Sequence, residues 1–356
     1  MLYIGTDQGI YRWFAGAGWP IFHSLQGHSI VGLASPGGGV LVALDTTAQV
    51  WESQNNGTDW QTIPLSAPAG RPTSLAFVNN SEFVVSTSRP LGLFQRPIGL
   101  ACETDAPKTF DRARKLEDGL IERATGLVTR LRGGSSNANA TLQRPIATMS
   151  GWTALSLPTT ASVARFINSN HGTTYVAVPG SGLWAKSDLE KTWTKLPGLP
   201  DEVYTIRFAP TTIAVGTNDG VKLSGDGGQT WTDASGGLEK VRQVRSLDIK
   251  PGDPKVMLAG CAPFGAGEGP VADRAGLQFA LYETKDGGKT WKHVTRGFPE
   301  VLESDSIADI RYLPEDPSCA AIALASGEMW NTSSDGLWWE PLARQIRGAR
   351  ILCVTS

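Results

Sequence analysis

Ser-Gly-Asp-Gly-Gly-Gln-Thr-Trp at residues 224–231 and Thr-Lys-Asp-Gly-Gly-Lys-Thr-Trp at residues 284–291 are two nearly identical stretches of this sequence. Looser copies begin at Ser53, Ser187 and Ser333. In such a stretch the aspartate can accept hydrogen bonds from backbone N–H groups two and three residues further on. Glycine can take the positive φ of the corner, and the tryptophan begins the next strand. Each copy therefore predicts a stapled β-hairpin with a structural role.

These copies sit in a longer repeat of four short strands and roughly 40 residues, which is typical of a propeller blade. In the copy at Ser333, Asp335 takes the place of the aspartate. A tryptophan marks the fourth strand of each unit, and these markers are Trp19, Trp60, Trp152, Trp193, Trp231, Trp291 and Trp338.

The two ends of the chain complete one unit between them. Six units begin near residues 31, 72, 163, 203, 244 and 307, whereas the N-terminal residues offer strands two to four only. Residues 351–355 read as a first strand with nothing after it, so we expect them to pair with residues 2–5. The sequence thus predicts an all-β fold: one domain over residues 1–356, a seven-bladed β-propeller of four-stranded blades closed by its N- and C-terminal strands.

Two insertions interrupt the repeat. Residues 98–150 fall within blade two, and residues 109–132 have the apolar periodicity of an amphipathic helix, ending at a Gly/Ser-rich stretch. This predicted helix either packs on its own propeller or contacts a partner protein or a second copy. The leucines we expect in such a contact are Leu116, Leu120, Leu127 and Leu131.

The repeated stretch resembles the Asp-box, S-x-D-x-G-x-T-W, which is also called the BNR repeat. Asp-box propellers include the sialidases, but the F/Y-R-I-P motif of that family has only the weak matches Phe-Gln-Arg-Pro-Ile at 94–98 and Leu-Gln-Arg-Pro-Ile at 142–146. The repeat also resembles the photosystem II assembly factors, seven-bladed propellers that act by binding polypeptides. Other Asp-box glycoside hydrolases place their carboxylates between two propellers, and this chain has one.

Composition excludes several classes of partner. A formal net charge of −2 gives no general attraction to nucleic acid, and no apolar run is long enough to span a membrane. The N-terminus lacks the features of a signal peptide. The four cysteines are far apart, which indicates free thiols and a cytoplasmic protein. The four histidines lack metal-ligand spacing, so we expect neither a metal nor a cofactor.

Ligands of propellers usually bind near the channel mouth, on the face that carries the connections between blades. A second insertion, at residues 261–278, lies on this face and is the best candidate for a ligand or partner loop. Arginine and carboxylate residues together suit a polar or anionic ligand, and they suit ordinary solvated loops equally well. The predicted ligand-binding residues are Arg71, Arg242, Glu268, Asp273, Arg274, Glu303 and Arg347.

No catalytic residue emerges from the sequence. It therefore favours a non-catalytic binding or scaffold propeller for protein–protein or polar-ligand recognition. The alternative is a carbohydrate-active hydrolase or lyase that uses carboxylates at the mouth. Two carboxyl groups roughly 5–10 Å apart in a deep pocket would favour the enzyme, whereas arginines and glutamates splayed around a flat mouth would favour binding alone.

Overall fold

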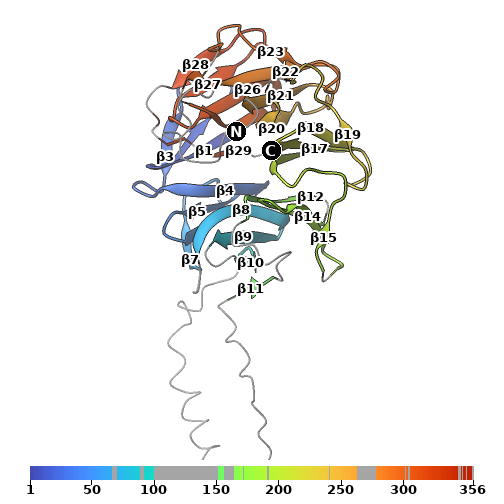
Figure 1. The fold of residues 1–356 in the computed structure, drawn as a ribbon. Helices are drawn as coiled ribbons and strands as arrows, with labels where there is room; N and C mark the ends of the chain where they lie inside the picture. The colour runs from blue at the N-terminus through green and yellow to red at the C-terminus, as the bar shows by residue number, and fades with distance from the viewer. Residues whose placement is uncertain are drawn as a thin grey trace, which may run out of the picture.

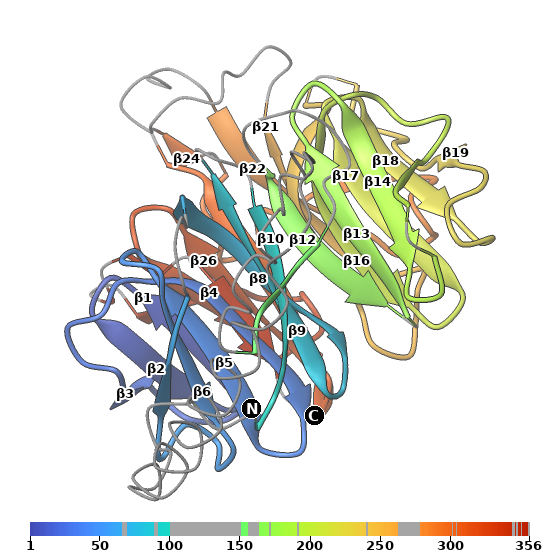
Figure 2. The same cartoon turned by 90° about the horizontal axis from the view of Figure 1, so that it is seen from below.

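Seven antiparallel sheets are arranged around a central axis in the computed structural model of the chain (Figures 1 and 2). The structure describes residues 1–65, 70–88, 92–99, 151–155, 164–170, 172–190, 192–239, 241–262, 278–300, 302–303, 305–343, 346, 348–349 and 351–354. The predicted helix at 109–132 and its four leucines lie outside these residues. Within them every regular element is a β-strand.

Each blade begins with an inner strand and proceeds outward through antiparallel hairpins. The inner strands are β4 (Ile30–Gly37), β8 (Arg71–Asn79), β12 (Phe166–Asn170), β16 (Val203–Ala209), β20 (Gln243–Ile249), β25 (Ile307–Leu313) and β29 (Ile351–Val354). The second strands are β5 (Val40–Asp45), β9 (Glu82–Ser88), β13 (Thr173–Val178), β17 (Thr212–Thr217), β21 (Met257–Ala262), β26 (Asp316–Leu324) and β1 (Leu2–Thr6).

The outer half of each blade is more exposed and its last strand is short. The third strands are β6 (Gln49–Ser53), β10 (Gly92–Pro97), β14 (Gly182–Ser187), β18 (Gly220–Ser224), β22 (Gln278–Thr284), β27 (Met329–Thr332) and β2 (Gly9–Trp13). The outermost strands are β7 (Gln61–Pro64), β11 (Thr153–Ala154), β15 (Thr194–Lys195), β19 (Thr232–Asp233), β23 (Lys292–His293), β28 (Glu340–Ala343) and β3 (Ile21–Ser24).

Strand β29 closes the ring by pairing with β1, as the sequence predicts. The register joins Leu2 to Val354 and Gly5 to Ile351, and the resulting sheet has the order β29-β1-β2-β3. We call this sheet the terminal blade and number the other six from β4 onward. Figure 1 shows both chain ends near the centre of the molecule.

Blade five departs from the expected four strands. A short strand, β24 (Leu302–Glu303), pairs with the first residues of β22, so this sheet has five strands. Strand β24 lies on the connection from blade five to blade six. Four strands per blade is therefore the rule for the other six sheets only.

The core lies between the blades. The second strands are buried on both faces, as in β21, where all six residues are buried. This two-sided burial explains their continuous apolar sequences, because both faces contact a neighbouring sheet. One such layer packs Leu258 and Leu281 of blade five against Ile310 and Ile322 of blade six. The ring is thus held by apolar contacts between sheets and by hydrogen bonds within them.

The stapled turns form with a different spacing from the one predicted. Asp226 Oδ1 accepts hydrogen bonds from the N–H groups of Gln229 (3.0 Å) and Thr230 (2.9 Å), which lie three and four residues on. Ser224 Oγ also contacts this carboxylate, at 2.7 Å, and accepts a bond from Gly228 N. Gly228 has a φ of 94°, as the corner requires.

The copy near residue 333 is shifted by one residue from the predicted register. Gly336 N donates to Thr332 Oγ1 (3.2 Å) and Trp338 N donates to Ser334 Oγ (3.0 Å), so Ser334 stands in the aspartate's position. The predicted aspartate, Asp335, instead lies at the turn position directly before Gly336, where its φ is 55°. The buried fourth-strand marker is accordingly Trp339, at 1% exposure, and Trp338 is 61% exposed.

Closure of the ring can be tested by truncation. Deleting residues 349–356 removes the inner strand of the terminal blade and exposes the edge of β1. We expect a loss of several kcal/mol of stability, measured by denaturant unfolding. A chain that ends at Val354 is the matched control and should keep the parental stability. Equal unfolding midpoints for all three proteins would contradict closure by β29.

The turn aspartates should stabilise the fold in a pH-dependent way. Hydrogen bonds, first from the Thr230 side chain, hold the pKa of Asp226 well below its usual range, and those from Thr290 lower the pKa of Asp286 to about 2. A depressed folded-state pKa contributes stability above the unfolded value of about 4, and that contribution is lost as the pH falls toward the folded value.

We therefore expect Asp226→Ala with Asp286→Ala to lower the melting temperature at pH 7 by a few degrees. The difference from the parent protein should shrink between about pH 4 and pH 2. Glu190→Ala, at another exposed carboxylate, should leave the melting temperature unchanged. A difference between parent and double variant that is the same at pH 7 and pH 2 would rule out a role for these carboxylates.

Candidate functional site

A central channel runs along the axis and is lined by residues from all seven inner strands. Its volume is about 550 Å³, which falls within the range of ligand pockets, about 300–1,000 Å³. Two walls differ in character. The wall formed by β4 and β8 carries small and apolar side chains, whereas β16, β20, β25 and the residue directly before β12 contribute four arginines. These are Arg165, Arg207, Arg245 and Arg311.

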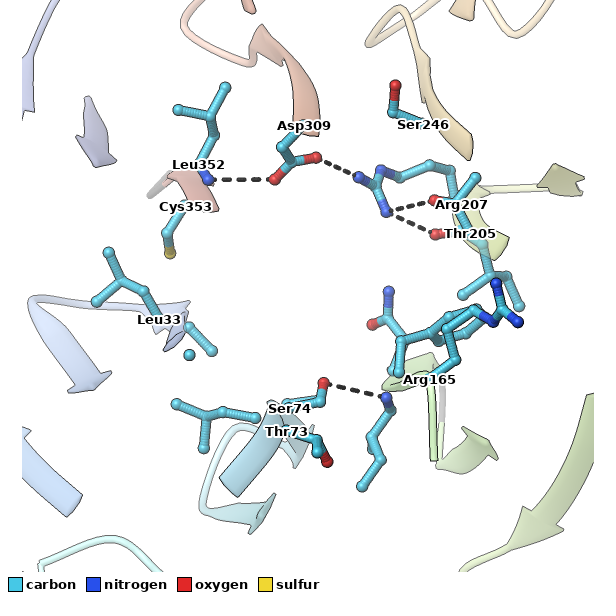
Figure 3. A pocket seen from close by; sticks show the side chains of 18 of the residues that line it. Leu33, Thr73, Ser74, Arg165, Thr205, Arg207, Ser246, Asp309, Leu352 and Cys353 are labelled. Carbon is cyan, nitrogen blue, oxygen red and sulfur yellow. Dashed lines mark hydrogen bonds and ion pairs between the residues drawn. The ribbon is translucent and has the colours of Figure 1, made fainter. Parts of the chain in front are cut away.

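The deeper part of the arginine wall is a compensated charge network. Arg207 contacts Asp309 (2.8 Å) and Asp248 (3.2 Å), and Arg311 contacts Asp309 at 3.4 Å and Asp248 at 4.0 Å. Figure 3 shows Arg207 and Asp309 side by side, across the channel from Leu33 and Thr73. Two positive and two negative groups thus share a mostly buried site, which limits the cost of removing each from water.

The aspartates of this network also bind the backbone of the next blade. Asp248 Oδ2 accepts a hydrogen bond from Tyr312 N (2.7 Å), and Asp309 Oδ2 accepts one from Leu352 N (3.1 Å). Burial nevertheless raises the pKa of Asp248, and the adjacent guanidinium groups of Arg311 and Arg207 oppose that rise. The network joins β16, β20, β25 and β29, so it holds the inner strands of four blades together.

A second group of arginines lies at the end of the channel where the inner strands begin. Arg165 directly precedes β12, and Tyr204 and Arg245 are among the first three residues of β16 and β20. Both guanidinium groups lie over the Tyr204 ring, at 4.4 Å for Arg165 and 4.9 Å for Arg245. Arg165 also contacts Glu202 at 2.6 Å, and Arg245 donates to Gln243 Oε1 at 2.9 Å.

Most of the predicted ligand residues lie elsewhere or outside the described part of the chain. Arg71 is an exposed residue at the start of β8, and it does not line the channel. Arg242 is held by Asp219 (2.9 Å) and Asp233 (3.6 Å). Glu303 lies on β24, with its side chain not described. Outside the described residues are Glu268, Asp273, Arg274 and Arg347, with most of the 261–278 loop.

Three of the four channel arginines lie within inner strands, whereas the ligand residues predicted from the sequence lie mainly in the connections between blades. Arg207, Arg245 and Arg311 lie within inner strands that also carry other polar residues, such as Asp248 of β20 and Asp309 of β25. Charged residues in a central strand are rare unless they are paired or face a cavity. The charged residues within these strands are visible in the sequence. The channel that they face follows only from the arrangement of the blades.

Other kinds of site are not seen in the described residues. No group of three or more His, Cys, Asp or Glu side chains there is placed to hold a metal ion. Cys261, Cys319 and Cys353 are buried free thiols, and burial raises the pKa of Cys353 to about 12. Nor does the described part of the chain include a helix that could cross a membrane.

Among the residues that the structure describes, the channel offers groups that can bind a ligand and no pair of carboxylates placed for hydrolysis. Among the described lining residues the channel has one carboxylate, Asp309, and two arginines engage it. Hydrolysis of a glycosidic bond usually requires two carboxyl groups on opposite sides of the substrate. The guanidinium groups of the arginine wall can instead donate hydrogen bonds to a negatively charged group.

No protein-family model matches the chain, and no curated protein matches its sequence. Solved structures resemble its fold. YCF48 bound to D1 peptide has a TM-score of 0.53 at 12% identity, over 93% of this chain and 87% of that one. YCF48 from Cyanidioschyzon merolae has a TM-score of 0.52 at 11% identity, over 90% and 86% of the two chains.

A GH74 enzyme from Niastella koreensis gives a TM-score of 0.63 at 14% identity, over 95% of this chain and 51% of that one. The chain thus spans about half the length of that enzyme. At these identities the likeness concerns the fold alone: the chain has the seven-bladed β-propeller architecture.

Proposed function

We propose that this chain is a non-catalytic binding propeller that accepts an acidic polypeptide segment or another polar anion in its central channel. The observation that carries the proposal is the distribution of charge along the channel, where four arginines and one aspartate line the described walls. The deeper network is internally balanced, with Arg207 and Arg311 opposite Asp248 and Asp309. We place the acidic group of the ligand near Arg165 and Arg245, whose guanidinium groups both lie over Tyr204 at one end of the channel, with Arg165 also in contact with Glu202.

Geometry supports a narrow ligand rather than a folded domain. A volume of about 550 Å³ suits a few residues of extended chain or a small molecule. A guanidinium group recognises a carboxylate through paired hydrogen bonds, and Tyr204 fixes the orientation of both groups by cation–π contact. The β4 and β8 wall offers Leu33, Ala34 and Ala76 to apolar parts of the same ligand.

Structural likeness gives a precedent for a polypeptide ligand. A YCF48 propeller has been solved with a D1 peptide bound, and that chain has nearly the same extent as this one. The GH74 enzymes share the fold but are about twice as long. The bound peptide of that structure and the arginines of the channel together favour binding over hydrolysis. We also propose that the repeats of this chain are Asp-box repeats.

Arg245 provides the direct test. We expect short fluorescein-labelled peptides ending in two or three acidic residues to bind the protein in a salt-sensitive way, measured by fluorescence anisotropy. Arg245→Gln removes the charge and should weaken binding by roughly tenfold or more, because a hydrogen bond to a charged group contributes about 1.5–3 kcal/mol. Peptides with neutralised acidic side chains and an amidated C-terminus should bind weakly.

Arg12→Gln is the matched control, because Arg12 is an exposed residue of β2 away from the channel. It should leave the peptide affinity unchanged. The proposal fails if no acidic peptide binds at low salt, or if Arg245→Gln and Arg12→Gln affect binding equally. Melting temperatures of both variants close to that of the parent would show that neither result reflects unfolding.

A further inference from the structure

A β-bulge occurs at the same level of five inner strands. In blade one, Ile30 pairs with Asp45 and Gly32 pairs with Leu44, so Val31 is an extra residue without a partner in the ladder. The register shifts in the same way in blades two, four, five and six, at the second or third residue of each inner strand. The extra residues there are Thr73, Tyr204, Arg245 and Ala308.

Blade three has the same irregularity at the start of its inner strand. Arg165 N donates to Ala177 O (2.8 Å), and Phe166 is paired with Ala177 as well, so two residues oppose one. In the terminal blade the residue at this place in the sequence is Arg350, which lies outside the described residues. We call the six residues that the structure describes the entrance residues: Val31, Thr73, Arg165, Tyr204, Arg245 and Ala308.

The bulges turn these side chains toward the channel. All six entrance residues line it. Val31 is partly accessible although Ile30 and Gly32 on either side are buried, and the extra residues of β16, β20 and β25 are likewise accessible between two buried neighbours. A bulge changes the direction of one side chain relative to the rest of its strand. Six blades thus present one side chain each at the end of the channel where the inner strands begin.

The bulge fixes the direction of the side chain but not its chemical type. Equivalent places in the six blades hold valine, threonine, arginine, tyrosine, arginine and alanine. The residues directly before them are all apolar: Ile30, Pro72, Ala164, Val203, Val244 and Ile307. Packing between blades therefore constrains the preceding position, whereas the entrance residues can differ from blade to blade according to what the channel binds.

The entrance residues of neighbouring blades form two sides of different character. Blades three to five contribute Arg165, Tyr204 and Arg245, and blades one and two contribute Val31 and Thr73. The Thr73 hydroxyl is already bonded to Ser86 Oγ (2.7 Å). No charged residue of blades one and two lines the described part of the channel. In Figure 3, Leu33, Thr73 and Arg165 follow one another around the channel, so the apolar side adjoins the arginines directly.

We infer that the entrance residues determine which peptide the channel accepts, and that its ligand carries an apolar side chain next to the acidic group. The inference rests on the proposed function. Arg165 and Arg245 receive the acidic group, and Val31 contacts the adjacent apolar side chain. The deeper network of arginines and aspartates holds the inner strands together and takes no part in this selection.

Two fluorescein-labelled peptides of equal charge test the inference, one with leucine and one with glycine beside its acidic residues. In fluorescence anisotropy the parent protein should bind the leucine peptide about tenfold more tightly, because burial of most of a leucine side chain contributes roughly that factor. Val31→Ser removes the apolar contact, and Val31→Thr keeps the shape of the side chain but replaces a methyl group with a hydroxyl. Both should bring the two affinities closer together, and Val31→Ser more so.

Val40→Ser is the matched control, since Val40 is a half-buried residue of β5 in the same blade that does not line the channel. It should keep the preference of the parent. If the parent binds both peptides equally and Arg245→Gln weakens both, the proposed function stands and this inference fails. A preference that survives both Val31 variants also overturns the inference. Binding of neither peptide overturns the proposed function, and the inference with it. Should Val31→Ser melt well below the parent, Val31→Thr decides, because its shape is that of valine.

Discussion

The register between Leu2–Gly5 and Ile351–Val354 is the constraint on which the rest of the structure depends. A four-stranded sheet cannot bury its two faces alone, and in this ring each blade is covered by the blade on either side. Opening the ring at one point would expose two faces of the apolar core at once. Pairing of the chain ends therefore secures contacts made by every other blade.

Closure creates a second requirement at the axis. Each inner strand has one edge without a neighbour in its own sheet, so backbone N–H groups on that edge need other acceptors. Side chains of the preceding blade meet this need. Ser74 Oγ accepts from Ile167 N, and the carboxylates of Asp248 and Asp309 accept from Tyr312 N and Leu352 N.

The buried aspartates in turn explain part of the channel's positive charge. Two carboxylates that bind backbone groups at the axis require nearby cations, and Arg207 and Arg311 supply them. Arg165 and Arg245 do not take part in that network and stack on Tyr204 at the end of the channel, where Arg165 also contacts Glu202. Structural need thus accounts for the deep arginines, whereas the outer pair is where recognition of an anion is best placed.

The repeats in the sequence are enough to predict the fold, but they do not predict which residues line the channel. Strand period, turn residues and the unmatched chain ends were enough to predict seven blades and their closure, because these depend on local sequence. The shift at Asp335 arose because two adjacent tryptophans fit the repeat equally well, and only burial separates Trp339 from Trp338. The strand β24 was missed because it has two residues. Residues of the channel come from seven separate blades, and their proximity follows from ring geometry alone.

Hydrogen exchange followed by mass spectrometry, with and without a saturating acidic peptide, tests most directly whether the channel is the binding site. The account predicts that the peptide slows exchange at the beginnings of β12, β16 and β20, and leaves the outer strands β15, β19 and β23 unchanged. Slowed exchange confined to outer strands would show that the ligand binds elsewhere and would contradict the proposed role of the channel.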